Sequence, residues 1–228
     1  MLWVERKADE NSVDSLSRSL SISPALSRLL HLRGFDFSDS ALDFLKPKLA
    51  HLADPFEIPR LREAVLRIIK SIESREGILL VGDYDVDGIT STVLVKKILA
   101  TLGSDPFYVI PRRKDEGYGL TKEILARGLK LGDVKLVIAL DCGTNSFEEA
   151  KILAGKGIDL VVVDHHQAKE ELPEEPIMLN PHLHPDEGEP WRNLCSAGLA
   201  FKLIHGLIKE LRERDCSNAH SVDLKKIL

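Results

Sequence analysis

Cysteine is scarce in this sequence, which also has neither an excess of basic charge nor a long apolar run. The three cysteines, Cys142, Cys195 and Cys216, are odd in number and show no CxxC spacing. They predict neither a disulfide framework nor a zinc ribbon, and they favour a reducing, cytoplasmic environment. No apolar run approaches the roughly 20 residues of a membrane helix. The charged residues within 5–10 are not those of a secretory signal peptide.

The charge balance gives no support to broad electrostatic binding of DNA. With 31 basic and 36 acidic residues, the formal net charge is −5, so any nucleic acid must meet a local basic patch. The chain has 228 residues, of which 43% are hydrophobic. This is enough for one large domain, or one and a half smaller ones, and global disorder is not expected.

The hydrophobic pattern predicts a helical lead-in over residues 1–58 and an α/β domain over 59–228. Short helical patterns occupy 12–46, where Ser23-Pro24 predicts a helix start with proline at the first helical position. After an amphipathic helix that begins near residue 61, strands and helices alternate. The expected strands are 77–82, 107–110, 135–140, 158–163 and 176–179, and the expected helices are 88–102, 121–130, 146–156 and 196–213. Such an alternation of continuous apolar strands with helices predicts a mostly parallel sheet flanked by helices on both faces.

Two helix starts and two further segments complete the expected organisation. Thr121 and Ser146 each precede glutamate in the first turn of a predicted helix, which predicts N-caps. Residues 167–190, rich in Glu, Pro and His, predict a surface loop. Residues 221–228 are amphipathic and resemble the opening of a new element, so we expect the chain to be a fragment of a longer protein.

Acidic residues and histidines follow three of the expected strands. They are Asp83, Asp85 and Asp87 after strand 77–82, Asp141 after strand 135–140, and Asp164, His165 and His166 after strand 158–163. In a parallel α/β sheet, ligands bind at the C-terminal ends of the strands. Alternate side chains of an extended segment share one face, and three carboxylates there repel one another unless a cation screens them. The pattern therefore predicts a metal site.

Several of these residues also have a purely structural interpretation. Asp87 before Gly88 could cap the following helix, Asp141 could be a turn or N-cap aspartate, and His165 could be a hydrogen-bonded structural histidine. Cys142 is expected to be a small buried filler and not a nucleophile. Adjacent histidines on an extended segment point to opposite sides, so one ring can bind a metal while the other turns toward a substrate.

The ligand types narrow the choice of metal. Carboxylates and imidazoles without thiolate favour Mn²⁺ or Mg²⁺, with Fe²⁺, Co²⁺ and Zn²⁺ as alternatives. A bridging carboxylate such as Asp141 would permit two metals roughly 3.5–4 Å apart, a geometry used in phosphoester hydrolysis. A neighbouring His or Lys can then meet the charge that develops on the phosphoryl group.

Two specific motifs lie at these strand ends, GDYDVDGITS at 82–91 and VDHH at 163–166. Weaker blocks are EGYGL at 116–120, LDCG at 140–143, NP at 180–181 and SAGLAFKL at 196–203. In this order they resemble the DHH phosphoesterase superfamily and, within it, the RecJ-like single-strand-specific 5′→3′ DNA exonucleases. The resemblance covers most of residues 30–228.

The resemblance implies a metal-ligand set. It places Asp85 and Asp87 on different metals, makes Asp141 the bridge between the two, and assigns His165 to the second. Many relatives carry a metal-binding histidine four residues before the Asp85 position, where this chain has Val81. The resemblance therefore leaves the first metal with one ligand fewer, or dependent on Asp83.

The resemblance also implies catalytic and supporting roles. His166 would face the scissile phosphate, and Asp83 and Asp164 would be ligands or would support the ligands. The family has a further ligand aspartate in a later motif, a second catalytic domain and an OB-fold, and none of these occurs in this sequence. The chain then resembles an N-terminal piece of such a nuclease, weak or inactive by itself.

Candidate substrate-binding residues lie in two places. Arg112-Arg113-Lys114 precedes Gly117-Tyr118-Gly119, which is consistent with a loop that contacts phosphate and offers Tyr118 for base stacking, or with an ordinary solvated loop. Ser196 and Gly198, at the start of a predicted helix, could offer backbone N–H groups to an anion. The alternative for Gly198 is that it only permits close helix packing.

We therefore expect metal-dependent hydrolysis of phosphodiester bonds in single-stranded DNA from the 5′ end, in DNA repair and recombination. The expected protein is a cytoplasmic monomer without a membrane segment, and its expected partners are single-stranded DNA and a single-strand-binding protein or a helicase. One alternative is another DHH enzyme that acts on oligonucleotides, cyclic dinucleotides or pyrophosphate; the DYDVDG and EGYG blocks argue against it. The other is an inactive DNA-binding or scaffold fragment, against which the intact acidic and histidine set argues.

Overall fold

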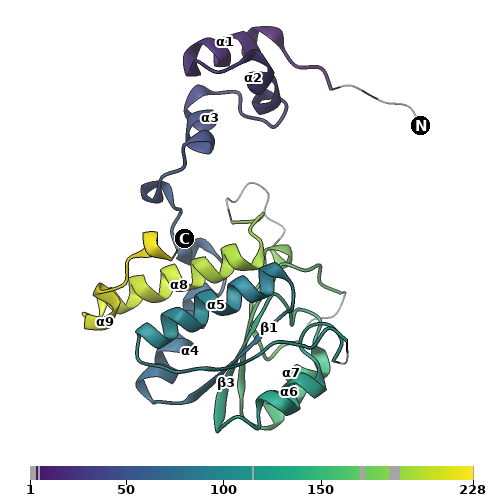
Figure 1. Cartoon of the computed structure of the whole chain (residues 1–228), viewed down its shortest axis with the longest axis vertical. Helices are drawn as coiled ribbons and strands as arrows, with labels where there is room; N and C mark the ends of the chain where they lie inside the picture. The colour runs from purple at the N-terminus through teal and green to yellow at the C-terminus, as the bar shows by residue number, and fades with distance from the viewer. Residues whose placement is uncertain (1–3, 5, 115, 170–172, 185–190, 228) are drawn as a thin grey trace. The chain divides into compact units, whose positions relative to one another are not determined.

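The computed structural model describes residues 4, 6–114, 116–169, 173–184 and 191–227, and it divides the chain into two compact units, Met1–Leu52 and Ala53–Leu228 (Figure 1). The first unit contains α1 (Glu10–Leu20), α2 (Pro24–His31), α3 (Ser38–Leu45) and a 3₁₀ turn, Leu49–His51. The predicted short helices are thereby confirmed, including the start at Ser23, whose side chain accepts the N–H of Leu26. The predicted domain boundary at residue 58 stays a prediction, because compactness does not test where a functional domain begins.

The second unit is built on a parallel sheet. In the part of the chain that the structure describes, five strands lie in the order β2-β1-β3-β4-β5, and every neighbouring pair is parallel. They are β1 (Gly77–Gly82), β2 (Phe107–Val109), β3 (Val134–Leu140), β4 (Asp159–Val163) and β5 (Ile177–Leu179). The predicted α/β class with a parallel sheet is confirmed. Since the order reverses beside β1, the carboxyl ends of β1 and β3 flank a switch point of the kind where ligands bind.

Helices cover both faces of this sheet (Figure 1). On one face lie α4 (Leu61–Glu73), α5 (Val86–Thr101) and α8 (Ser196–Glu213), and on the other α6 (Lys122–Gly128) and α7 (Phe147–Gly155). Successive strand side chains point to opposite faces, so Leu80 and Ile138 lie in the first core while Leu79 and Val137 lie in the second. Burial on both faces explains why the strands are continuous apolar runs.

Short elements complete the second unit. They are the 3₁₀ turns η2 (Pro55–Glu57), η3 (Pro181–Leu183) and η4 (Leu224–Lys226), and α9 (Ser217–His220). The predicted surface loop 167–190 contains β5 and η3, and its residues 170–172 and 185–190 lie outside the described residues. Among the helices that the structure describes, none combines the length and apolar character needed to cross a bilayer.

The register of the sheet aligns the residues that follow its strands. The N–H groups of Asp83, Asp141 and Asp164 each donate to the carbonyl of the last residue of the neighbouring strand, at 3.2, 2.9 and 3.1 Å. The ladder thus continues one residue beyond β1, β3 and β4. Three carboxylates from distant parts of the sequence are therefore brought to one edge of the sheet.

The start of α5 differs from the prediction. The helix begins at Val86, two residues before the expected start, because the Asp85 side chain accepts the N–H of Gly88 at 3.0 Å and acts as the N-cap. The cap that the sequence suggested as an alternative role for Asp87 is therefore made by Asp85, and Asp87 lies in the first turn.

Of the two other predicted N-caps, one is confirmed with its side-chain hydrogen bond, whereas the other has the predicted position without that bond. Thr121 accepts the N–H of Ile124 and caps α6. Ser146 makes no side-chain cap bond with α7, because its hydroxyl donates to the carbonyl of Leu120 at 3.0 Å. The competing partner comes from the segment before α6, so the short-range pattern around Ser146 could not indicate it.

Gly88 lets α5 begin close to the end of β1. A Cβ atom at this position would lie 2.6 Å from the backbone N and O atoms of Asp83. A backbone atom cannot rotate away as a flexible side chain can, so any larger residue has to push the helix start from the strand end. The glycine thus lets the first turn of α5 lie against the main chain of Asp83.

We predict that Gly88→Ala lowers the free energy of unfolding by about 2 kcal/mol or more through overpacking. Gly155→Ala is the matched control, because nothing lies within 4 Å of its added Cβ. Gly155 is helical, so this change is expected to be neutral or stabilising by up to about 1 kcal/mol. Urea unfolding of both variants measures the difference, and equal effects would contradict the close approach.

Candidate metal centre

Two overlapping groups of side chains could hold metal ions at the carboxyl edge of the sheet. Asp141, His165 and His166 form one group, and Asp83, Asp85 and Asp141 form the other. Within each group, one possible ligand atom from every residue lies within 4.8 Å of the others. Asp141 belongs to both groups, which is the position that a carboxylate shared by two ions would need.

The main chain at Asp141 is in an unusual conformation. Its φ angle is +64°, in the left-handed region, and Gly143 follows with φ +107°. A non-glycine residue there costs roughly 1–2 kcal/mol, although aspartate is among the few that tolerate it. Strain of this kind at a strand end, on a residue shared by both groups, points to a functional role.

The chemistry of the donor set fits a divalent cation. Both carboxylate oxygens of Asp141 and the Oδ2 of Asp83 are buried, and among the described residues they have no hydrogen-bond partner. Burial, reinforced by the carboxylates of Asp85 and Asp87, raises the pKa of Asp141 to about 7, and burial also raises the pKa of Asp83. Buried carboxylates without a partner are costly. Oxygen-binding cations such as Mn²⁺ or Mg²⁺ would satisfy them.

Asp87 is held differently from the other carboxylates. Its two oxygens accept the N–H groups of Ser196 and Ala197, at 2.9 and 2.7 Å, at the start of α8. Its Oδ2 also lies 3.6 Å from His165 Nε2, whereas Asp141 Oδ1 lies 3.5 Å from the same atom. Asp87 thus borders the centre and joins α5 to α8, and its role as a ligand stays a prediction.

The same contact bears on the predicted anion site at α8. The N–H of Ser196 is already directed at an anion, and that anion is the Asp87 side chain. A Cβ on Gly198 would lie 3.1 Å from Leu194 Cδ2, so this glycine lets the turn before α8 fold closely against the helix start. A phosphate that binds the N–H of Ser196 would have to displace Asp87, and the predicted phosphate contact of Gly198 stays a prediction.

Asp164 is saturated with hydrogen bonds. Its Oδ1 accepts the N–H groups of His165 and His166, and its Oδ2 accepts the N–H of Thr144. Although burial raises its pKa, the hydrogen bonds from Thr144 and His166 lower the pKa of Asp164 below its usual value. It belongs to neither of the two ligand groups found among the described residues, and its role, as a ligand or as support for the ligands, stays a prediction.

His166 lies between Asp164 and Tyr118. Its Nδ1 is 2.7 Å from Asp164 Oδ1, and its Nε2 is 2.7 Å from the Tyr118 hydroxyl. If Nδ1 carries the proton toward Asp164, Tyr118 donates to Nε2. Although burial lowers it, contact with Asp164 raises the pKa of His166 above its usual value. The predicted aromatic residue and the predicted catalytic histidine are thus brought together.

The predicted basic loop is partly engaged within itself. Arg112 donates its N–H to Glu116 at 2.8 Å and lies at 3.4 Å from it through its guanidinium, while Arg127 binds the same carboxylate at 2.9 Å. Arg113 lies over the ring of Tyr84, 5.4 Å from its centroid. Glu116 therefore holds the loop in shape, and Arg112 and Arg113 remain candidates for contact with substrate.

Two residues that hold the main chain at His166 were not predicted as functional candidates from the sequence. The Asn180 side-chain amide donates to Thr144 Oγ1 at 2.8 Å and to the carbonyl of His166 at 2.9 Å. Asn180 directly follows β5. A polar residue directly after an apolar strand is the same pattern that indicated Asp141, so this pattern could have indicated Asn180. Thr144 carried no comparable signal.

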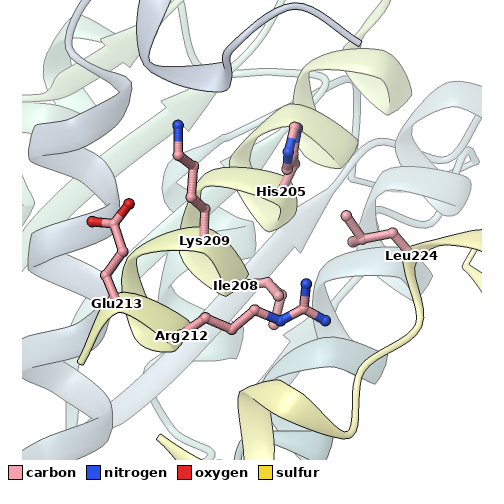
Figure 2. Close-up of a pocket in the computed structure, with 6 residues that line it drawn as sticks. All are labelled: His205, Ile208, Lys209, Arg212, Glu213 and Leu224. Carbon is pink, nitrogen blue, oxygen red and sulfur yellow. The ribbon is translucent and has the colours of Figure 1, made fainter. Parts of the chain in front are cut away.

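A separate hollow lies along α8. Its volume is about 350 Å³ (Figure 2), and it is lined by His205, Ile208, Lys209, Arg212, Glu213 and Leu224. Two of its cations have structural partners: Lys209 lies 2.6 Å from Asp54, and Arg212 donates to the carbonyls of Ala219 and Val222. These contacts secure η2 and α9 against α8.

Comparisons with known proteins identify the family and several relatives of this chain. The family model described as "DHH family, N-terminal domain" matches residues 77–225. The single-stranded-DNA-specific exonuclease RecJ of Bacillus subtilis is 38% identical over 211 residues, which are 92% of this chain and 27% of the relative. That of Haemophilus influenzae is 33% identical over 199 residues, 87% of this chain and 34% of the relative. The chain spans about a quarter to a third of the length of these curated relatives.

Solved structures show the same fold. A crystal structure of exonuclease RecJ bound to manganese superposes with a TM-score of 0.62 at 33% identity, over 68% of this chain and 38% of that chain. RecJ from Thermus thermophilus in complex with Mn²⁺ gives a TM-score of 0.70 at 28% identity, over 89% of this chain and 28% of that chain.

We predict that Asp141→Asn stabilises the metal-free protein at pH 8. The pKa of about 7 in the folded protein lies above the usual value of 3.8, so the charged carboxylate weakens the fold at high pH, and the penalty disappears below about pH 4. Removing the charge should raise the free energy of unfolding by about 2–4 kcal/mol at pH 8 and by little at pH 4. Asparagine also tolerates the left-handed backbone.

Denaturant unfolding in EDTA at the two pH values measures this effect. Asp105→Asn is the control, because Asp105 is 94% exposed and the same charge change there should alter stability little. Destabilisation of Asp141→Asn at pH 8 would show that this carboxylate has an internal partner after all.

Proposed function

Because this chain belongs to the DHH family, we propose that it supplies the metal-dependent centre of a single-stranded-DNA-specific exonuclease. The observation that carries the proposal is Asp141, a strained and buried carboxylate shared by both ligand groups. Relatives with the name of this activity align over 87% and 92% of the chain. The 5′→3′ direction and the role in DNA repair and recombination belong to the proposal as well.

The proposed ligands follow the two groups. Asp83 and Asp85 would hold one ion, His165 would hold the other, and Asp141 would touch both, with Asp87 at the border. When bound, Mn²⁺ or Mg²⁺ lowers the pKa of the attacking water and neutralises phosphoryl oxygens. The related RecJ structures bound to Mn²⁺ support this choice of metal.

His166 is proposed to face the scissile phosphate. Asp164 holds the Nδ1 side of the ring, so the Nε2 side is left for the substrate and for the Tyr118 hydroxyl that now contacts it. The raised pKa of His166 favours the protonated ring, which can donate a hydrogen bond to a phosphoryl oxygen in the transition state. Asp164 therefore acts through His166.

The strand itself would pass over the loop that precedes α6. Tyr118 is 51% exposed and offers a ring face for stacking, and the Arg112 side chain is 68% exposed. Arg113, over the ring of Tyr84, would add a second cation. Such a local patch is compatible with a chain whose net charge is −5, because the contact is confined to one loop.

The surroundings of the enzyme are part of the proposal. We propose a cytoplasmic monomer that meets single-stranded DNA alongside a single-strand-binding protein or a helicase. The absence of a bilayer-crossing helix among the described residues is compatible with this setting. Size-exclusion chromatography with light scattering tests the oligomeric state.

We predict that this chain, with Mn²⁺, shortens a 5′-phosphorylated, 3′-labelled single strand progressively from its 5′ end, at the low rate expected of the chain by itself. Asp141→Asn and His165→Ala should each reduce the rate by at least about 100-fold, whereas Asp105→Asn should leave it unchanged. Gel analysis of the labelled products measures rate and direction. Variants within a few-fold of wild type would refute the assignment of the centre.

The same assay distinguishes the alternative functions. We predict that a 30-nucleotide single strand is degraded at least about tenfold faster than a dinucleotide, since the loop contacts add binding energy only for a strand that reaches them. Preference for the dinucleotide would favour another DHH phosphoesterase. Mn²⁺ binding that Asp141→Asn abolishes, without any cleavage, would favour a binding or scaffold segment.

A further inference from the structure

A pocket of about 260 Å³ lies beside the candidate metal centre, on the side of α7. Tyr118 and Leu120 line it from the loop before α6, Asn145 from the turn before α7, and His166 and Lys169 from the segment after β4. The pocket shares His166 with the centre. A group bound in it would therefore lie next to the proposed scissile phosphate.

The pocket has a lysine at its edge, although the neighbouring centre is acidic. Asp164 is its acidic lining residue, and it is buried and satisfied by Thr144 and His166. Lys169 makes no ion pair with any carboxylate in the part of the chain that the structure describes. The ammonium group is thus available to an anion that enters the pocket.

Asn145 holds Lys169 in place. Its Oδ1 accepts the backbone N–H of Lys169 at 2.9 Å, and its Nδ2 donates to the carbonyl of Gln167 at 3.0 Å. One side chain thus ties the segment after β4 to the turn after β3. The two hydrogen bonds fix the main chain that carries the lysine at the edge of the pocket.

We propose that this pocket binds the nucleotide next to the scissile bond, with Lys169 against its phosphate and Tyr118 and Leu120 against its base. The proposal rests on the proposed nuclease function and adds a subsite to it. A cation, an aromatic ring and an apolar wall in one pocket match a nucleotide, which joins an anion to a flat apolar base. Asn145 is a positioning residue that acts through Lys169.

The test measures binding of a 3′-fluorescein-labelled dT₈ strand to the whole chain by fluorescence anisotropy. Ca²⁺ replaces Mn²⁺ in the assay to limit turnover. Each internucleotide phosphate is replaced in turn by an uncharged methylphosphonate. Lys169→Gln is compared with Lys130→Gln, a matched loss of charge at an exposed residue that follows α6, at the opposite edge of the sheet.

We expect Lys169→Gln to weaken binding of unmodified dT₈ about tenfold, as for loss of a hydrogen bond to a charged group. Lys130→Gln should change it less than about twofold, as for a distant exposed charge. In wild type, one methylphosphonate position should cause a similar loss, and at that position Lys169→Gln should cause no further loss. Asn145→Ala should reproduce the Lys169→Gln pattern more weakly.

Three results would overturn the proposal. They are unchanged binding by Lys169→Gln, an equal loss at every phosphate position, and no binding of dT₈ by wild type. If Mn²⁺-dependent cleavage that depends on Asp141 persists in Lys169→Gln with an unchanged KM, the pocket assignment fails while the nuclease function stands. If the wild-type chain does not cleave the strand with Mn²⁺, the proposed nuclease function itself fails.

Discussion

The parallel register of the sheet is the constraint on which the rest of the centre depends. Three neighbouring strands extend their hydrogen-bond ladder by one residue, and each of those residues is an aspartate. A one-residue slip of any strand would turn its aspartate to the other face of the sheet. It would also place the neighbouring apolar residue of that strand in the centre. The two cores that bury alternate strand residues resist such a slip, so the packing of the sheet secures the positions of the carboxylates.

Asp141 and Asp164 show how one scaffold gives two aspartates different chemistry. Both are about 1% exposed at the ends of adjacent strands. Asp164 receives hydrogen bonds from main-chain N–H groups and from a histidine, and its pKa is lowered. Asp141 receives none among the described residues, and its pKa is raised. The first is positioned to orient a neighbouring side chain, and the second has the properties expected of the proposed metal ligand.

Features that depend on local pattern could be predicted from the sequence, whereas those that depend on distant partners could not. Apolar runs predicted the strands, and the acidic residues after them predicted the location of Asp83 and Asp141. The contact of Asp87 with Ser196 joins residues 109 positions apart, and only the packing of α5 on α8 creates it. In the same way, the Ser146 hydroxyl donates to the carbonyl of Leu120 and does not cap α7. Lys169 is held by Asn145, which accepts its backbone N–H.

The contact of Asp87 with the start of α8 also sets an order of events during synthesis. Its two hydrogen bonds need Ser196 and Ala197, which leave the ribosome 109 and 110 residues after Asp87. At about 5–20 residues per second this is a delay of roughly 5–20 s. During that interval the nascent chain carries Asp83, Asp85 and Asp87 without the helix that completes their surroundings. The centre is therefore assembled late, from a carboxylate cluster that is translated early.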